Sequence, residues 1–353
     1  MSAPLTPEVL HYTGGDDDRG GIVSVVRNLA GAGRFVCVLG VNPGCVQHRQ
    51  PPLPVLELPR MDGEEIDPGN FWRTRAVAQA VQAWLRADAG RVFHGHSRAG
   101  LLVGLWLHWL GEKRVVVSVH CYGRQRWFYR WAARQLGARL FWLSPAMKKY
   151  YGVDNEGWAQ CIPGGVPPTL ASRSAPVAGC LRLGGIGALV SWKGWHTVIN
   201  AMALLPAGER ARVSFDHIGT GDEAYRAELD RLVASGGLSA QVVFHGAEPS
   251  SERLLGVIDA LVVASSNEPF SIAMLEALAA GVPVLAADSG GGADIIVDGL
   301  NGQRYCTGET AGLAALLREW LARSPAWPVE QIRATTVGID RVAGQWAKVY
   351  SAL

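Results

Sequence analysis

Short apolar runs rich in valine, isoleucine and leucine alternate with longer amphipathic stretches along most of the chain. The short runs predict strands, and the longer stretches repeat their apolar residues with the spacing of helices. Alternation of this kind is typical of parallel sheets covered by helices on both faces. The predicted strands are residues 36–39, 91–94, 115–119, 140–143, 181–186, 214–218, 241–244, 260–264 and 282–286, and three predicted helices are 194–205, 223–235 and 271–280.

The alternation weakens across residues 163–176, which are rich in Pro, Gly, Ser and Thr and therefore predict a linker. A chain of 353 residues also exceeds what one hydrophobic core normally covers, so we expect two domains. We assign residues 1–165 to an N-terminal domain, residues 166–328 to a C-terminal domain and residues 329–353 to a terminal helix.

The composition narrows the class of protein. Apolar residues make up 48% and charged residues 18%, which is typical of a globular chain, and a net charge of +2 gives no support for nucleic-acid binding. The six cysteines form no Cys-x-x-Cys pair, so we expect free thiols in a reduced compartment and no structural zinc. No signal peptide is recognisable, and the longest apolar run, residues 99–111, is too short to span a bilayer. We expect a cytoplasmic protein.

The most informative segment is residues 265–296, where a polar loop joins a predicted strand to a small-residue helix that starts near Phe270. Glu268 lies in the loop and Glu276 lies in the helix, with seven residues between them. The first backbone N–H groups of such a helix, here those of Phe270, Ser271 and Ile272, attract an anion such as a diphosphate. Carboxylates beside them can accept hydrogen bonds from sugar hydroxyls. The spacing alone is equally consistent with a buried helix that carries two incidental glutamates.

A second segment, residues 184–205, places Lys193 in the loop between a glycine-rich strand and a helix. An ammonium group there can neutralise the charge that builds on a departing diphosphate, although a solvated lysine beside a helix has the same pattern. Near the N-terminus, Gly20 and Gly21 open another helix, and a glycine pair either lets a phosphate approach the backbone or simply makes a turn.

Asp16, Asp17 and Asp18 precede that glycine pair and have the spacing of a metal-binding Asp-x-Asp. We expect these three carboxylates to belong to a solvated loop and assign no metal site.

Two histidines follow predicted strands of the first domain. His96 comes after the strand at 91–94, and His120 comes directly after the strand at 115–119. Because open α/β sheets bind ligands beyond the carboxyl ends of their strands, both side chains are expected to face a binding site, with Arg98 and Arg124 placed to meet an anionic acceptor. Either histidine could instead be a hydrogen-bonded structural group.

Residues 113–149 contain nine Lys and Arg but no Asp or Glu. This stretch predicts a helix drawn to anionic lipid or an entrance for an anionic acceptor, or else a packed helix whose arginines are solvated. Its aromatic residues Trp127, Phe128, Tyr129 and Trp131 interleave with Arg124, Arg126, Arg130 and Arg134.

Together these motifs resemble glycosyltransferase family four, and the resemblance covers most of the chain. In that family two glutamates with seven residues between them lie at and within the start of a small-residue helix that ends in a Gly-x-Pro turn, as they do here. The resemblance implies an α/β chain of GT-B architecture, in which two Rossmann-like domains face each other across a cleft. It also implies a retaining, metal-independent enzyme that uses a nucleoside-diphosphate sugar and no cofactor.

The resemblance assigns roles to individual residues. It places Glu276 on the donor ribose, Glu268 and His120 against the transferred sugar, and Lys193 on the diphosphate. Gly20, Gly21 and Gly219 would border the donor, and the segment from Trp346 to Tyr350 would belong to a final helix that crosses back to the N-terminal domain.

The chain departs from the family pattern at three positions. Ala188 stands where the family has an arginine that shares the diphosphate, and Arg124 and Arg182 are the candidates to replace that arginine. Asp294 replaces a glutamate after the glycines at 290–292, and Gly164 replaces an asparagine.

The function predicted from the sequence is sugar transfer from a nucleotide sugar to an acceptor hydroxyl in cell-surface glycan synthesis. The expected partners are a glycan or lipid-linked acceptor and, through residues 113–149, the anionic inner face of a membrane, but no nucleic acid. The missing arginine favours one alternative, a non-catalytic nucleotide-sugar-binding subunit. A sugar-nucleotide epimerase of the same fold is the other alternative.

Overall fold

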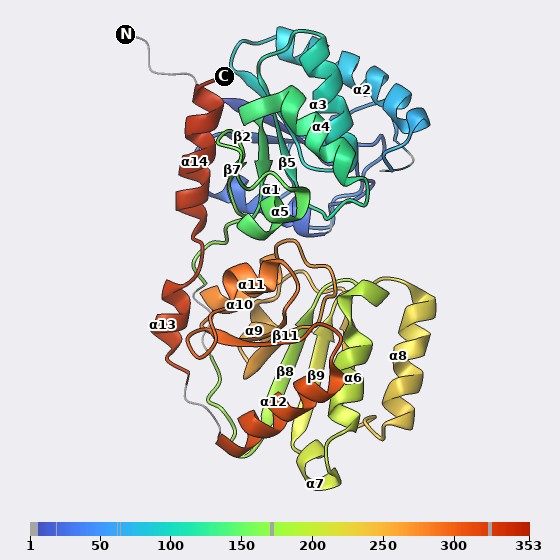
Figure 1. Ribbon diagram of the computed structural model, residues 1–353, viewed down its shortest axis with the longest axis vertical. Helices are drawn as coiled ribbons and strands as arrows, with labels where there is room; N and C mark the ends of the chain where they lie inside the picture. The colour runs from blue at the N-terminus through green and yellow to red at the C-terminus, as the bar shows by residue number, and fades with distance from the viewer. Residues whose placement is uncertain (1–5, 19, 62, 64, 170–172, 324–326) are drawn as a thin grey trace. The chain divides into compact units, whose positions relative to one another are not determined.

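The structure is a computed structural model, and it describes residues 6–353 except 19, 62, 64, 170–172 and 324–326. The chain divides into two compact units, each built on its own sheet (Figure 1). Unit 1 comprises Met1–Pro167 and Val337–Leu353, and unit 2 comprises Pro168–Thr336.

Unit 1 holds a seven-stranded sheet in the order β3-β2-β1-β4-β5-β6-β7, and the paired strands are all parallel. The strands are β1 Glu8–Tyr12, β2 Val36–Val41, β3 Val55–Glu57, β4 Arg91–Gly95, β5 Val115–Val119, β6 Leu140–Trp142 and β7 Gln160–Cys161. The helices are α1 Gly21–Gly31, α2 Pro68–Arg86, α3 Arg98–Trp109, α4 Arg126–Leu136, α5 Pro145–Tyr151 and α14 Ile339–Ser351, with a short 3-10 turn η1 at Gly137–Arg139.

Helix α3 fixes the end of strand β4. The Ser97 side chain accepts a hydrogen bond from the Gly100 backbone N–H at 3.0 Å and so caps the helix immediately after the strand. Gly95 and Gly100 permit this tight turn, because a Cβ on Gly95 would lie 2.6 Å from the Gly100 carbonyl oxygen. His96 is consequently held between a strand end and a helix start.

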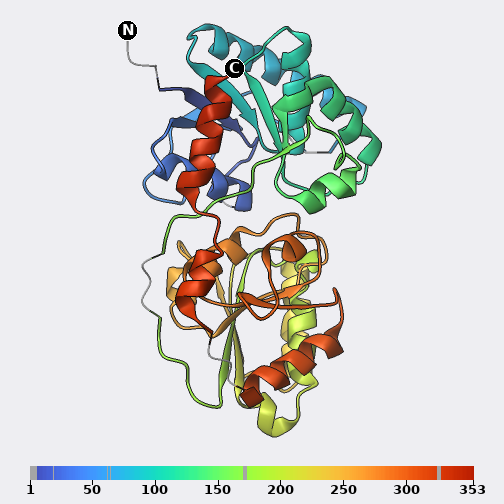
Figure 2. The same cartoon turned by 60° about the vertical axis from the view of Figure 1, so that its left-hand side comes forward.

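Helix α14, the last helix in the chain, packs against the sheet of unit 1 (Figure 2). Its Trp346 ring lies 4.4 Å from the His94 ring and 4.9 Å from the Phe141 ring, between ring centroids. Its Tyr350 hydroxyl is hydrogen-bonded to Nδ1 of His94 at 2.7 Å.

Unit 2 holds a six-stranded parallel sheet in the order β10-β9-β8-β11-β12-β13. The strands are β8 Leu181–Ile186, β9 Val213–Ile218, β10 Val242–Gly246, β11 Ala260–Val263, β12 Val284–Ala287 and β13 Gly302–Tyr305. The helical segments are η2 Ser191–Lys193, α6 Trp195–Ala203, α7 Ala207–Arg210, α8 Glu223–Ser235, α9 Glu252–Leu255, α10 Ile272–Ala279, α11 Gly291–Ile295, α12 Thr310–Arg323 and α13 Val329–Ala334.

Two apolar cores cover the two faces of the unit 2 sheet. One core is formed with α6, α8 and α12, and includes Trp195 and Leu317. The other is formed with α9, α10 and α13, and includes Met274 and Ile332. Burial on both faces explains why the strands of this sheet are nearly continuous apolar runs in the sequence.

All nine predicted strands and the three predicted helices are present, with ends that differ by at most two residues. The parallel arrangement is confirmed, whereas β1, β3, β7 and β13 were not predicted. Residues 329–353 do not form one terminal element. They are divided, because α13 packs in unit 2 while α14 belongs to unit 1. Part of the predicted linker, residues 170–172, lies outside the described residues.

Candidate functional site

Lys193 and Glu268 meet at one edge of the unit 2 sheet. Lys193 ends the short turn η2 after β8, and Glu268 follows β11, the neighbouring strand. Nζ of Lys193 lies 2.6 Å from Oε2 of Glu268, and the Ser265 hydroxyl donates to the same carboxylate oxygen at 3.1 Å. Both charged side chains are largely buried, so the charge-assisted hydrogen bond between them at the carboxyl edge of the sheet is strong.

Gly194 makes this meeting possible. Its backbone φ is +72°, in the left-handed region, and a Cβ built on it would lie only 2.2 Å from the Ala264 carbonyl oxygen. The loop that carries Lys193 therefore rests directly on the end of β11. The Ser266 N–H donates to the Trp192 carbonyl oxygen at 2.8 Å and closes the contact.

We expect Gly194→Ala to lower the free energy of unfolding of unit 2 by about 2–3 kcal/mol, since it adds a backbone clash to the cost of a left-handed alanine. Gly308→Ala is the matched control, because Gly308 has a φ of +78° and nothing within 4 Å of its added Cβ. That control should lose only about 1 kcal/mol. Urea titration of both variants measures the difference, and equal losses would contradict the tight contact with Ala264.

Helix α10 lies beside the Lys193–Glu268 pair. The structure corrects its predicted start, since the helix begins at Ile272 and Ser271 is its cap, accepting a hydrogen bond from the Met274 N–H at 3.3 Å. Phe270 therefore precedes the helix, in the same loop as Glu268. The Glu268 carbonyl oxygen accepts from the Gly291 N–H at 2.7 Å, which ties this loop to the glycine-rich start of α11.

Glu276, on the second turn of α10, is partly exposed. Its Oε2 accepts a hydrogen bond from the Ser251 hydroxyl at 2.8 Å. The two glutamates that the sequence pairs by spacing thus have different surroundings. Glu268 is buried against a cation, whereas Glu276 is held by a hydroxyl at the start of α9.

Gly219 follows β9 and packs against the loop after β8, where its Cβ would lie 2.0 Å from the Gly187 carbonyl oxygen. Ala188, which occupies the position of the family arginine, offers its carbonyl oxygen to Nε1 of Trp195 at 2.9 Å. Arg182 does not replace that arginine, contrary to one expectation. It lies near the amino end of β8 and forms hydrogen bonds with both Asp259 carboxylate oxygens, at 2.7 and 3.0 Å.

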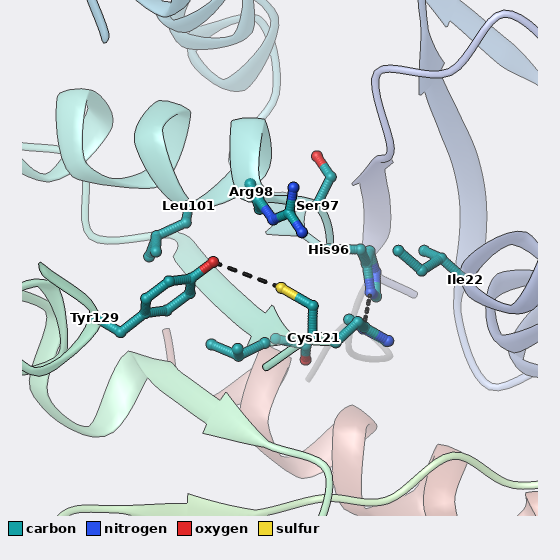
Figure 3. A pocket seen from close by; sticks show the side chains of 10 residues that line it. Ile22, His96, Ser97, Arg98, Leu101, Cys121 and Tyr129 are labelled. Carbon is teal, nitrogen blue, oxygen red and sulfur yellow. Dashed lines mark hydrogen bonds between the residues drawn. The ribbon is translucent and has the colours of Figure 1, made fainter. Parts of the chain in front are cut away.

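Four histidines of unit 1 lie in contact with one another, and two of them, His11 and His94, also contact rings of helix α14. His11 of β1 lies opposite His94 of β4, and His96 and His120 follow β4 and β5. Nδ1 of His11 is 2.9 Å from Nε2 of His96. Nδ1 of His96, which is labelled in Figure 3, is in turn 3.0 Å from Nε2 of His120. His94 joins the Tyr350 hydroxyl to the Ser118 hydroxyl, at 2.7 and 2.8 Å.

Burial keeps these imidazoles neutral. It lowers the pKa of His11 to about 3 and that of His120 to about 4. The pKa values of His94 and His96 also lie well below their ordinary range, because of burial first and then of mutual repulsion among the histidines. The sequence analysis missed His11 and His94, although the His-Gly-His at 94–96 places two imidazoles on one face of the strand.

Nitrogen atoms of His11, His94 and His96 all lie within 4.8 Å of one another, which is compatible with a metal site. Both nitrogens of His94 and both of His96 are already engaged in hydrogen bonds. Nε2 of His11 is the cluster's unpaired ring nitrogen among these three described residues. We therefore treat the cluster as a hydrogen-bonded network.

His96 and His120 border a small pocket of unit 1 with a volume of about 70 Å³ (Figure 3). This volume is enough for a few water molecules or one hydroxyl-bearing group. Arg98 and Ser97, from the start of α3, also line the pocket, whereas Arg124 is not among its lining residues. The remaining lining residues are Ile22, Leu101, Ser118, Val119, Cys121 and Tyr129.

Gly20, with a φ of +94°, caps α1, which begins at Gly21 and contributes Ile22 to the pocket. Of the aspartates before it, Asp16 is exposed, as expected of a solvated loop, but the expectation is wrong for Asp18. Asp18 is fully buried, accepts hydrogen bonds from the His48 and Arg49 backbone N–H groups at 2.7 and 3.1 Å, and pairs with Arg27. Although burial raises the pKa of Asp18, these hydrogen bonds hold that pKa below its ordinary value.

The comparisons with known proteins bear mainly on unit 2. Residues 183–331, which include Lys193, Glu268 and Glu276, match the family model of glycosyl transferases group 1. Unit 2 carries a group 1 glycosyltransferase domain.

Two curated relatives extend this result. The chain is 31% identical over 163 residues to the lipopolysaccharide core biosynthesis glycosyltransferase LpsE of Rhizobium meliloti, an alignment that covers 46% of this chain and 45% of LpsE. The chain thus spans less than half the length of that relative. It is also 25% identical over 287 residues to the lipopolysaccharide core biosynthesis mannosyltransferase LpcC of Rhizobium leguminosarum bv. viciae, covering 74% of this chain and 78% of LpcC.

Solved structures extend the likeness in fold to both units. The structure of Anabaena HepE in complex with UDP and glucose superimposes with a TM-score of 0.77, at 19% identity, over 98% of this chain and all of that one. The chain therefore has the predicted GT-B fold of two Rossmann-like domains.

Proposed function

We propose that the protein is a retaining glycosyltransferase that moves a sugar from a nucleoside-diphosphate donor to an acceptor hydroxyl in cell-surface glycan synthesis. The observation that carries the proposal is the buried Lys193–Glu268 pair at the carboxyl edge of β8 and β11, beside the start of α10. Ligands of open α/β sheets bind at this edge. LpsE and LpcC, which are both named for lipopolysaccharide core biosynthesis, support the acceptor class.

The proposed reaction is a front-side displacement. The acceptor oxygen attacks C1 of the sugar on the face from which the diphosphate departs. The bond between C1 and the diphosphate oxygen breaks, and its electron pair stays on the leaving group. That leaving group takes the acceptor's proton. Lys193 and the backbone N–H groups at the start of α10 stabilise the charge that develops on the diphosphate.

The two glutamates serve the donor in different ways under this proposal. Glu268 orients Lys193 and accepts hydrogen bonds from the sugar hydroxyls, while Glu276 accepts from the ribose hydroxyls. Because Lys193 supplies positive charge at the diphosphate, the proposal includes no metal and no cofactor, and turnover should be unchanged by EDTA. The six free thiols are in keeping with a cytoplasmic location.

Nucleotide binding can be tested by thermal shift of the purified protein with UDP-, GDP-, ADP- and TDP-sugars. A donor present at about 100 times its Kd should stabilise unit 2 by about 2.7 kcal/mol and raise its Tm by about 5–10 °C. We expect Glu276→Ala to lose this shift. Glu228→Ala, which removes an exposed carboxylate from α8, should keep it.

The thermal-shift and transfer measurements together distinguish an active transferase from a non-catalytic nucleotide-sugar-binding subunit. If a donor binds but no acceptor supports transfer, Ala188 at the position of the family arginine would make a nucleotide-sugar-binding subunit the better description. If no nucleotide sugar shifts the Tm of the wild type at millimolar concentration, the donor site itself is wrong.

A further inference from the structure

A continuous row of aromatic rings crosses helices α2, α3 and α4 of unit 1. The helices pack side by side, α2 against α3 and α3 against α4 (Figure 1). We call this set of rings the aromatic row. Successive ring centroids are 5.5 Å apart for Trp72–Trp106, 5.5 Å for Trp106–Trp109, 5.9 Å for Trp109–Trp131, 5.4 Å for Trp131–Phe128 and 5.9 Å for Phe128–Trp127.

Much of the aromatic row is exposed. The exposed fraction is 65% for Trp127, 60% for Trp72 and 43% for Trp109. Each tryptophan offers a large apolar surface, and a connected group of them on a folded protein marks a surface that is covered by a partner. The proposed transfer reaction assigns no role to these residues, so their exposure must have another cause.

The charges within the three helices of the aromatic row are all of one sign, although flanking carboxylates pair with Arg86 and Arg98. No Asp or Glu occurs within α2, α3 or α4. Cationic side chains accompany the rings instead, and the Arg75 guanidinium lies 5.7 Å from the Trp106 ring centroid. The arginines of the three helices are Arg73, Arg75, Arg86, Arg98, Arg126, Arg130 and Arg134.

This surface differs from the one predicted for residues 113–149. Phe128 and Tyr129 of that stretch are buried, so α4 packs on unit 1 through these two rings. Trp127 and the arginines face outward, while Trp72 and Trp109 come from outside the predicted stretch. The packed-helix and interfacial interpretations of α4 therefore each describe one of its faces.

We propose that the aromatic row, with its surrounding arginines, binds the surface of a membrane that contains anionic phospholipids. Indole rings settle at the level of the lipid headgroups, where one edge of the ring is apolar and the other is wet. Arginines beside them are attracted by anionic headgroups. In the described part of the chain, no helix is both long and apolar enough to cross a bilayer, so the attachment is at the surface.

The test is co-sedimentation of the full chain with vesicles of phosphatidylglycerol and phosphatidylcholine, compared with vesicles of phosphatidylcholine alone. We expect Trp72→Ser/Trp127→Ser to lower the partition coefficient by roughly tenfold or more. We expect Arg73→Gln/Arg130→Gln to weaken binding to the anionic vesicles alone, as added salt should. Leu204→Ser is the control, because Leu204 is 60% exposed in unit 2, and it should bind like the wild type.

Two results would overturn the proposal. One is a wild type that sediments no better than the tryptophan double variant, with both proteins folded by circular dichroism. The other is a lipid-free dimer by light scattering that the double variant abolishes while vesicles leave the wild type in solution, since a second copy of the chain would then cover the row. Neither result depends on sugar transfer, so the proposed reaction is tested separately.

Discussion

Replacing Lys193 with alanine is expected to lower kcat by roughly two to three orders of magnitude, the usual loss when one charge-stabilising group of a transition state is removed. The positive charge at this position is needed most when the diphosphate departs, so binding of the donor should weaken less than turnover. Initial-rate measurements over a range of donor concentrations separate kcat from KM. A variant that keeps full turnover would show that Lys193 has no part in the reaction.

Folding must be monitored in the same variant, because Lys193→Ala leaves the buried Glu268 carboxylate without its cation. That carboxylate would keep the hydrogen bond from Ser265. The double variant Lys193→Ala/Glu268→Gln removes the unpaired charge and should recover part of any lost stability. It should not recover activity, and this contrast distinguishes a catalytic effect from an unfolding effect.

Unit 1 is expected to lose stability steeply as the pH falls below about 6.5, the ordinary pKa of histidine. His11, His94 and His96 are buried and neutral in the folded unit, and their folded-state pKa values are lowered. Below pH 6.5 the unfolded chain therefore binds more protons than the folded one, and the free energy of unfolding falls with pH. Each of these histidines contributes up to about 1.4 kcal/mol per pH unit, so the three together contribute about 4 kcal/mol per unit, and His120, whose pKa is also lowered, adds to this slope.

Urea titrations between pH 7 and pH 4.5 measure this slope. His11→Gln removes one titrating group and should reduce the slope by about 1.4 kcal/mol per pH unit. His48→Gln, which replaces an exposed histidine of the same unit, is the matched control for the loss of an imidazole. If His11→Gln leaves the slope as steep as in the wild type, protonation of the buried histidines is not the cause of the loss of stability in acid.

The sequence predicted the fold well where local pattern and packing agree. Strands buried on both faces are continuous apolar runs, and caps such as Ser271 and Gly194 have recognisable local signals. Strand β1 was missed because it is short and carries His11 in its buried half, so it lacks the usual apolar run.

The arrangement of the candidate site residues could be predicted only in part. Lys193 and Glu268 were recognised from their loops, but the direct contact between them depends on the pairing of β8 with β11 and on the approach of Gly194 to Ala264. The burial of Asp18 depends on a loop thirty residues away, whose backbone supplies its hydrogen bonds. The aromatic row draws on three helices, so no single stretch of sequence contains it. These features arise from tertiary contacts, and sequence periodicity carries no direct signal for them.

The assignment of α14 to unit 1 has a consequence for the order in which the chain folds during synthesis. Unit 2 is continuous in sequence, so it can close as soon as Thr336 has been made. Unit 1 begins first but finishes last, because Tyr350 and Trp346 must be available to cover His94. Until the ribosome has released these residues, His94 lacks the two side chains that cover it. In a nascent chain, unit 2 should therefore fold before unit 1 is complete, because the amino-terminal sheet needs the carboxyl-terminal helix.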